Sequence, residues 1–402
     1  MQHRIHPLLA AGAVALSLAL AGPARADAVT GWNLHANHFV VEAKLGTPPA
    51  IRVLAFVQTA VLEALQAALP QRGRPAASAD AAVAAANRTV LVALLPAQQA
   101  AIDAAYEQAI ARIADGPARQ RGIALGERAA AKLLQARLDD GAATPESYRP
   151  HAAAGAYVPT VVPGTTTWGQ RKPWLMSHGA QVRPDAPPAL TSETWARDFN
   201  EVRVLGRRDS ALRSAEQTAV ARFWDYSLPP IYYGVVHSVA QRPERDLVRN
   251  ARLFAAAAQA MDDAMIAVFD AKYRYALWRP VTAIRNGDRD GNDATPRDAS
   301  WAPLIDNPMH PEYPSGHGIL AAAVGTVLKA EIGAGPAPVL VTRSPTANGA
   351  TRQWNDVEDF VREVGESRIL AGIHFRSAIE ASDAMGRQIG TLAVARHLEG
   401  PQ

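Results

Sequence analysis

Two basic residues in the last third of the chain have a spacing that suits anion binding. Lys272 and Arg279 are seven positions apart in a segment that ends Arg279-Pro280. Seven residues make almost two turns of a helix, so both cations are predicted to leave the same face. Two cations on one face repel each other unless an anion lies between them. Taken alone, the pair is more often a solvated surface feature.

A second segment, Pro314-Ser-Gly-His317, directly precedes an apolar run. Ser315 is placed to cap a helix predicted over 316–332, and the amides around Gly316 would point out of the helix N-terminus toward an anion. His317 would lie beside that anion and could move protons. A plain capping or surface role for this histidine is the competing interpretation.

The third segment contains Arg368 and His374, six positions apart. On a regular helix they would be about 120 degrees apart, so they converge only through the reach of Arg368 or a local break near Gly372. A buried structural histidine is the alternative. Together the three segments supply three cations, a hydroxyl, a glycine amide and two histidines. This set matches the needs of a tetrahedral or trigonal-bipyramidal oxyanion.

The motifs Lys-x6-Arg-Pro, Pro-Ser-Gly-His and Ser-Arg-x5-His, in this order, resemble the three signature motifs of the vanadium-dependent haloperoxidase and type 2 phosphatidic acid phosphatase superfamily. Residues 200–202, 214–224, 270–273 and 310–314 are similar to the bacterial haloperoxidase-like branch. The resemblance covers most of the chain after residue 26, more loosely before residue 190. It implies an all-α fold, a helical bundle of the chloroperoxidase and acid phosphatase type with long loops.

The resemblance also implies which residues bind the anion. Lys272, Arg279 and Arg368 would neutralise the equatorial oxygens of vanadate or phosphate. The Ser315 hydroxyl and the Gly316 amide would assist them. One pocket can serve both anions because vanadate mimics the five-coordinate geometry of phosphoryl transfer.

The two histidines take different roles in this comparison. His374 would be the axial group, which binds the vanadium of vanadate in a haloperoxidase and becomes phosphorylated as the nucleophile in a phosphatase. His317 would be the acid–base residue. His310 occupies a position where this chain resembles family bromoperoxidases, so the resemblance favours bromide or iodide over chloride. A structural role for His310 in a Pro-rich loop is equally compatible with the sequence.

One position departs from the family pattern. Many members place Asp four residues after the second histidine, but here that residue is Ala378, and the nearest acids are Glu380 and Asp383. The partner that would orient His374 is therefore open. A nucleophilic histidine needs a carboxylate to fix its tautomer, whereas a metal-ligand histidine can use a carbonyl. The departure favours vanadium chemistry or a weakened phosphatase.

Three functions follow as hypotheses. The leading one is a haloperoxidase that uses a vanadate cofactor to oxidise bromide or iodide with hydrogen peroxide. The alternative is a secreted acid phosphatase that hydrolyses phosphomonoesters through phospho-His374 and needs no cofactor. The third is an inactive oxyanion-binding protein. The expected partners are these small molecules, and the oligomeric state is left open.

Composition narrows the remaining possibilities. Of 402 residues, 41 are basic and 38 acidic, and no dense basic run occurs, so we expect no nucleic-acid partner. The chain has no cysteine, which rules out zinc–thiolate sites, disulfides and cysteine nucleophiles. Residues 1–26 combine Arg4, an apolar run and Ala24-Arg25-Ala26, the pattern of a cleaved signal peptide. The protein is therefore expected to be exported, to the periplasm or the medium.

The elements that position the motifs are predicted to be helices. The apolar run in 1–26 is shorter than the roughly 20 residues of a membrane span, and no later stretch is expected to qualify, so stable membrane insertion is not expected. We expect several helices from the start of the mature chain to about residue 140, one of them capped by Thr47. A long Pro- and Gly-rich loop over 141–190 either caps a pocket or bridges two layers. Further helices follow to the end, including one over 215–226 that starts with a capping box of Ser214 and Gln217 and a long one over about 244–278. The predicted divisions are a signal peptide (1–26), an N-terminal helical part with the long loop (27–190) and a C-terminal catalytic part (191–402).

Overall fold

The computed structural model describes residues 27–70 and 72–399, and the predicted signal peptide lies outside them. The described residues are predominantly helical, as expected, with one short hairpin. The helices are α1 (Ala28–Glu42), α2 (Thr47–Ala68), α3 (Ala79–Leu94), α4 (Gln99–Ala111), α5 (Pro117–Ala136), α6 (Glu193–Leu205), α7 (Ala215–Phe223), α8 (Pro230–Ala240), α9 (Leu247–Tyr275), α10 (Pro280–Arg285), α11 (Gly316–Ile332), α12 (Val357–Leu370) and α13 (Arg376–His397), and the strands are β1 (Leu340–Ser344) and β2 (Ala350–Trp354).

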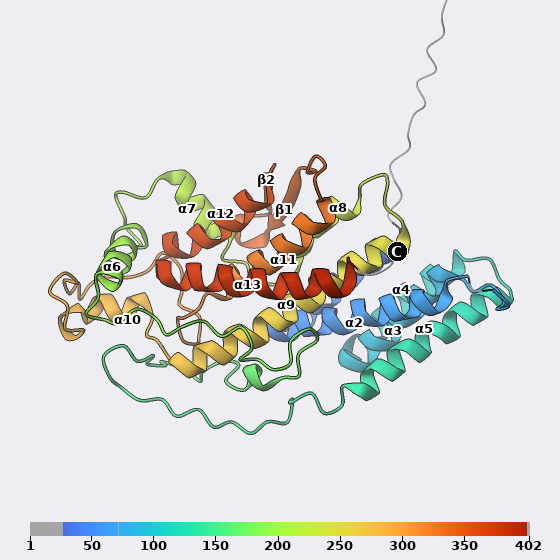
Figure 1. Ribbon diagram of the computed structural model, residues 1–402, viewed down its shortest axis with the longest axis horizontal. Coiled ribbons are helices and arrows are strands. Elements are labelled where there is room, and N and C mark those ends of the chain that lie inside the picture. Colours follow the sequence, from blue (N-terminus) through green and yellow to red (C-terminus); the bar gives the residue numbers. More distant parts are fainter. Residues whose placement is uncertain (1–26, 71, 400–402) are drawn as a thin grey trace, which may run out of the picture.

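Helix α9 is the central element of the fold. It runs through the middle of the molecule, with α2 on one side and α11 and α13 on the other (Figure 1). Its side chains are buried on all faces over most of its length, as in a helix enclosed by others. The Ala-rich α3 and α5 pack closely on α2 at one end of the molecule (Figure 1). The main hydrophobic core therefore spans both predicted parts of the chain.

Most predicted helices are confirmed within a few residues. The predicted capping box is present, because the Ser214 side chain accepts from the Gln217 amide while the Gln217 side chain accepts from the Ser214 amide. Thr47 does not cap α2 as its type suggested. Gly46 occupies the cap position, and the Thr47 hydroxyl bonds to Ser227 Oγ at 2.6 Å.

Two helices and one β-hairpin were not predicted. Helices α8 and α10 are short, and the antiparallel pair β1–β2 follows α11 in a region without clear alternation. Leu340 and Trp354 are opposite each other in this hairpin, and both are buried against the core. Such short elements are stabilised by tertiary contacts rather than by local sequence preference.

The long loop between α5 and α6 runs along one side of the molecule from one end to the other (Figure 1). It is anchored close to the first motif, because the Tyr157 amide donates to the Ala276 carbonyl at 2.7 Å and the Tyr273 hydroxyl donates to the Gly164 carbonyl. The Gly164 amide donates to the Met309 carbonyl at 2.7 Å. The loop thus covers the segments that flank Lys272 and His310, in agreement with the cap interpretation.

Helix α2 corrects the expectation that no later segment could span a membrane. By length and composition alone it is the one described helix that could, and 83% of its most apolar window is buried inside the protein. A buried core helix passes the same test.

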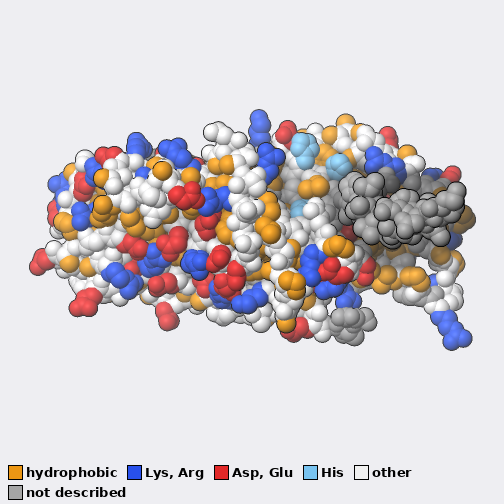
Figure 2. All heavy atoms as spheres, turned by 90° about the horizontal axis from the view of Figure 1, so that it is seen from above, with side chains coloured by type: hydrophobic (Ala, Val, Ile, Leu, Met, Phe, Trp, Pro, Cys, Tyr) orange, Lys and Arg blue, Asp and Glu red, His pale blue; other side chains and the backbone are white. Residues whose placement is uncertain are grey.

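The face seen in Figure 2 shows acidic and basic side chains interspersed, with no extended patch of one sign.

A buried ion pair connects α2 to α9, the helix that carries Lys272. Arg52 donates to Asp262 at 2.6 Å and to Asp140 at 2.8 Å, and the Asp262 side chain is fully buried. Asp263 accepts three backbone amides from the long loop, at Trp174, Leu175 and Met176. Asp262 and Asp263 therefore connect α9 to α2 and to the long loop, respectively.

We predict that Arg52→Ala lowers the free energy of unfolding by about 3–5 kcal/mol, because it leaves Asp262 buried without its cation. The matched control is Arg88→Ala, which removes a partly exposed pair with Asp103 (side chains 34% and 28% exposed) and should cost only about 0–1 kcal/mol. Urea unfolding of both variants measures the difference. Equal losses would show that the Arg52 pair has no special structural role.

Candidate oxyanion site

Lys272 and Arg279 converge by a route that differs from the predicted one. Helix α9 ends at Tyr275, and Ala276 adopts a left-handed conformation (φ 46°) that terminates it. Arg279 is instead the N-cap residue of α10, where Pro280 occupies the first turn. The two cations therefore do not share one helix face, and a turn in the chain brings them together.

Lys272 is fully buried, and its ammonium group holds the segment before the second motif. It donates to the carbonyl oxygens of Pro311 at 2.9 Å, Glu312 at 2.8 Å and Pro314. An ammonium group has three N–H donors, so all of them are engaged. An anion could gain a direct hydrogen bond only by replacing one of these carbonyls.

Arg279 is 2% exposed and contacts the third motif and the segment that precedes the second. Its Nε donates to the His310 carbonyl at 3.0 Å, and one terminal nitrogen donates to the Ile373 carbonyl at 2.9 Å. The same nitrogen lies 3.3 Å from His374 Nε2, and the other donates to His310 Nδ1 at 3.0 Å. Arg279 therefore joins the segment at 310 to the segment at 374.

The second motif folds as predicted. Ser315 is the N-cap of α11, and its buried Oγ accepts from the Gly318 amide at 3.3 Å, which leaves the hydroxyl hydrogen free to donate. Gly316 opens the helix, where N–H groups have no acceptor within the helix. A Cβ added to Gly316 would meet only Met265 Cε, at 4.0 Å. Open space therefore adjoins the start of α11.

The predicted break near Gly372 is confirmed. Helix α12 ends at Leu370, Gly372 adopts a positive φ of 80°, and α13 starts at Arg376. A Cβ on Gly372 would lie 2.3 Å from the Gly206 carbonyl oxygen, so both the torsion and the close approach require glycine. His374 lies in this connection and is 2% exposed.

A carboxylate holds the His374 ring, and it is Glu312 rather than either acid considered from the sequence. His374 Nδ1 lies 2.8 Å from Glu312 Oε1, which also accepts the Phe375 amide at 2.9 Å. Glu312 is completely buried. Glu380 is exposed, and Asp383 pairs with Arg387 at 2.8 Å. A carboxylate on Nδ1 leaves Nε2 facing Arg279.

Two buried nitrogen atoms of the site have no hydrogen-bond partner among the described residues. Arg368 is 2% exposed and donates through one terminal nitrogen to the Trp224 carbonyl, while its Nε has no hydrogen-bond partner among the described residues. His317 Nε2 is likewise buried without a partner. Unpaired buried polar atoms are costly, so a ligand that pairs with both is expected.

The pKa values of the cations reflect the shortage of counterions. Burial lowers the pKa of Arg279 to about 10 and that of Arg368 to about 10. Both guanidinium groups therefore remain charged at neutral pH. Burial, with repulsion from Arg279, lowers the pKa of Lys272 well below its usual value, and Glu312 opposes the shift. A bound anion would reverse these shifts by pairing with the cations.

The histidines respond to the same cations. Burial first, then Arg279, Lys272 and Arg368, lowers the pKa of His374 well below its usual value. Burial and Arg368 lower that of His317 in the same direction. Both rings are therefore neutral at neutral pH, as a metal ligand or a nucleophile must be. Burial raises the pKa of Glu312 to about 7, although Lys272 and Arg279 oppose the shift.

These features fit a tetrahedral oxyanion such as vanadate or phosphate. The anion would take the open space beside Gly316 and accept from Arg368 Nε, and His317 Nε2 would adjoin it. Its charge would offset the buried cations. The described residues contain no group of three or more acidic, histidine or cysteine side chains that could chelate a metal ion, so a three-histidine site is not formed.

His310 is half-buried beside these groups. Its Nδ1 lies 3.0 Å from an Arg279 terminal nitrogen and 3.3 Å from the Pro311 carbonyl oxygen. The tautomer in which Nδ1 accepts from Arg279 carries its hydrogen on Nε2. The edge of the His310 ring meets the Phe269 ring at a centroid distance of 5.1 Å and an angle of 78°. His310 therefore lies next to Arg279, and its link with halide choice stays a prediction.

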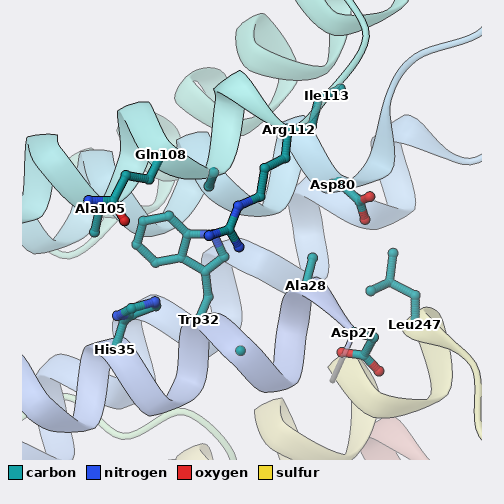
Figure 3. Close-up of a pocket in the computed structure, with 12 residues that line it drawn as sticks. Asp27, Ala28, Trp32, His35, Asp80, Ala105, Gln108, Arg112, Ile113 and Leu247 are labelled. Atoms are coloured by element: carbon teal, nitrogen blue, oxygen red, sulfur yellow. The ribbon is translucent and has the colours of Figure 1, made fainter. Parts of the chain in front are cut away.

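A surface cavity of about 540 Å³ lies elsewhere, between α1, α4 and the start of α9. Figure 3 shows Arg112 beside the Trp32 indole, with His35, Asp27 and Asp80 around the space. None of its lining residues belongs to the three motifs. Asp27 is already engaged as the cap of α1 and by Asn250, so this cavity has no evident chemistry.

The sequence predicts the three cations and two histidines that the structure gathers here, but it gives no direct indication of Glu312. The only signal was its place in the segment 310–314, which was noted for its similarity to the haloperoxidase branch. Its distance of 62 positions from His374 gave no reason to pair them. Glu312 reaches His374 because Lys272 and Arg279 hold the segment 310–314 against His374.

Known proteins resemble this chain in sequence and fold. Residues 252–400 match the family model described as the VCPO second helical-bundle domain. Vanadium chloroperoxidase of Curvularia inaequalis is 30% identical over 142 residues, which cover 29% of this chain and only 23% of that protein. A crystal structure described as the first bacterial vanadium-dependent iodoperoxidase has a TM-score of 0.78 and 22% identity, with coverage of 92% of this chain and 96% of that one.

A second bacterial structure, a holo-type vanadium-dependent chloroperoxidase, has a TM-score of 0.65 and 19% identity, with coverage of 89% of this chain and 94% of that one. At these identities the structural likeness shows the fold. The family match covers the segment that contains all three motifs. The segment 252–400 therefore matches the vanadium chloroperoxidase family in sequence, and the described part of the chain shares the fold of the vanadium-dependent haloperoxidases.

Proposed function

We propose that this protein is a vanadium-dependent haloperoxidase that oxidises bromide or iodide with hydrogen peroxide. The observation that carries the proposal is a pair of buried nitrogen atoms without partners, Arg368 Nε and His317 Nε2. They lie in a site whose neutral His374 directs Nε2 toward Arg279. Such a site suits an oxyanion that also takes one nitrogen ligand. Vanadate satisfies both requirements.

The residues of this chain would hold the cofactor and manage protons. Arg368, the Ser315 hydroxyl and the Gly316 amide would bind the vanadate oxygens, and His374 Nε2 would be the nitrogen ligand. When bound, vanadate supplies a Lewis acid that makes hydrogen peroxide electrophilic toward halide. Halide, peroxide and one proton yield hypohalous acid and water. His317 is placed to transfer that proton, because its Nε2 is unpartnered.

The proposal for the halide rests on His310. Its Nε2–H is free to donate in the tautomer in which Nδ1 accepts from Arg279. A neutral donor beside a cationic site suits a large, weakly hydrated anion better than a small one. The similarity to a structure described as an iodoperoxidase is consistent with this preference. We also propose that the protein is exported to the periplasm or the medium, because residues 1–26 have the pattern of a signal peptide.

Phosphomonoester hydrolysis is a second candidate, and the Glu312 contact favours it. The missing acid at position 378 argued against a nucleophilic His374, but Glu312 Oε1 supplies a carboxylate at 2.8 Å. His374 Nε2 would attack phosphorus, and His317 would protonate the leaving alkoxide. Water would then hydrolyse phospho-His374 and release phosphate. Trapping phosphate on His374 distinguishes this activity from oxyanion binding without turnover.

We expect bromide and iodide oxidation by the purified protein to appear on titration with orthovanadate and to saturate near one equivalent. The reason is that the site offers one nitrogen ligand and one set of oxyanion donors. Peroxide-dependent bromination or triiodide formation measures the activity, with His374→Ala as the inactive control. Absence of activity across the whole titration would reject the haloperoxidase proposal.

We predict that Arg368→Ala weakens orthovanadate binding roughly 10–100-fold, since a hydrogen bond to a charged group contributes about 1.5–3 kcal/mol. Arg362→Ala is the matched control, because Arg362 lies on the same helix, is 68% exposed and pairs with Asp359 at the surface. Isothermal titration calorimetry measures both dissociation constants. Comparable affinities in the two variants would remove Arg368 from the site.

A further inference from the structure

Glu312 contacts the first and third motifs of the candidate oxyanion site and lies just before the second in sequence. Its carbonyl accepts from Lys272 at 2.8 Å, and its amide donates to the Leu277 carbonyl at 2.9 Å. Its carboxylate bonds to His374 and to the Phe375 amide. Glu312 lies three residues before Ser315. Hydrogen bonds therefore fix the backbone of Glu312 independently of the contact between its side chain and His374.

The position that lacks a carboxylate, Ala378, contacts the second motif. Ala378 is fully buried, and its carbonyl accepts from the Ser315 amide at 3.3 Å, so α13 meets the second motif there. An acidic side chain at 378 would start from the first turn of α13, one turn beyond His374. Carboxylates at 312 and 378 would approach the same histidine from two adjoining segments.

We propose that Glu312 is the positioning residue of His374, and that it replaces from the second motif the carboxylate that Ala378 does not provide. Glu312 touches no substrate or cofactor in this scheme. It acts by holding the hydrogen of the His374 ring on Nδ1 and by fixing the plane of the ring, so that the Nε2 lone pair stays directed into the anion site. The proposal rests on the proposed function only for the identity of the anion.

The geometry supports this role in two ways. Glu312 Oε1 accepts at 2.8 Å from Nδ1 and at 2.9 Å from the Phe375 amide, so it fixes the ring and the N-cap residue of α13 together. Arg279 lies 3.3 Å from Nε2, on the opposite side of the ring. Carboxylate partners of ligand histidines set the tautomer and raise the basicity of the ring. Without Glu312, a ring among three cations could turn or place its hydrogen on Nε2.

The first test is the tautomer of His374 in the vanadate-free protein, measured by ¹⁵N NMR with histidine labelling and assigned by comparison with His374→Gln. We expect the wild-type ring to be protonated on Nδ1, and Glu312→Ala to shift it toward the Nε2–H form or to a mixture. The double variant Glu312→Ala/Ala378→Asp should restore the Nδ1–H form. Thermal unfolding of each variant shows whether it is folded.

The second test is orthovanadate binding by calorimetry. Glu312→Ala should weaken binding by about 10–100-fold, the usual effect of losing a carboxylate that supports a ligand histidine, and the double variant should recover part of the loss. Asp383→Asn is the control, because Asp383 is the acid on α13 that pairs with Arg387 instead. If Glu312→Ala does not fold, Glu312→Gln replaces it, with the Nδ1–H form retained and weaker vanadate binding expected.

An unchanged tautomer and an unchanged dissociation constant in the folded Glu312→Ala variant would overturn the proposal, as would a Glu312→Gln variant that binds vanadate as tightly as the wild type. Failure of the proposed function gives a different result. In that case the wild type would oxidise no halide with vanadate, while the tautomer would still respond to Glu312→Ala.

Discussion

The burial of three cations around His374 is the constraint on which the rest of the structure depends. Lys272, Arg279 and Arg368 are almost completely inaccessible, and Glu312 is the one buried carboxylate that contacts His374. Removing charges from water is expensive unless they are paired. The fold therefore has to supply acceptors for these groups when no anion is bound.

Backbone carbonyls meet most of this demand. Six backbone carbonyls accept from the three cations. Those of His310, Pro311, Glu312, Pro314 and Ile373 accept from Lys272 or Arg279, and that of Trp224 accepts from Arg368. Carbonyl dipoles reduce the cost of buried cations without neutralising them. This arrangement keeps the donors ordered and leaves net positive charge for an incoming oxyanion, so the site is preorganised rather than assembled on binding.

Local sequence determined much of this outcome, and tertiary contacts determined the remainder. The helix start at Ser315 and the break at Gly372 follow from residue type, because one caps an N-terminus and the other tolerates a positive φ. The sequence predicted that α9 continues to Arg279-Pro280, but the helix ends at Tyr275. The left-handed conformation of Ala276 could not be expected, because alanine rarely adopts it. Glu312 could not be assigned because its partner depends on how the segment before α11 meets the α12–α13 connection.

The central claim is that His374 Nε2 is the single nitrogen ligand of a bound oxyanion. X-ray absorption spectroscopy at the vanadium edge of the purified protein, loaded with one equivalent of orthovanadate, tests it most directly. The account predicts one imidazole nitrogen in an otherwise all-oxygen shell, lost in His374→Ala. Vanadium with an all-oxygen shell in the wild type, or a nitrogen ligand that persists in His374→Ala, would contradict it.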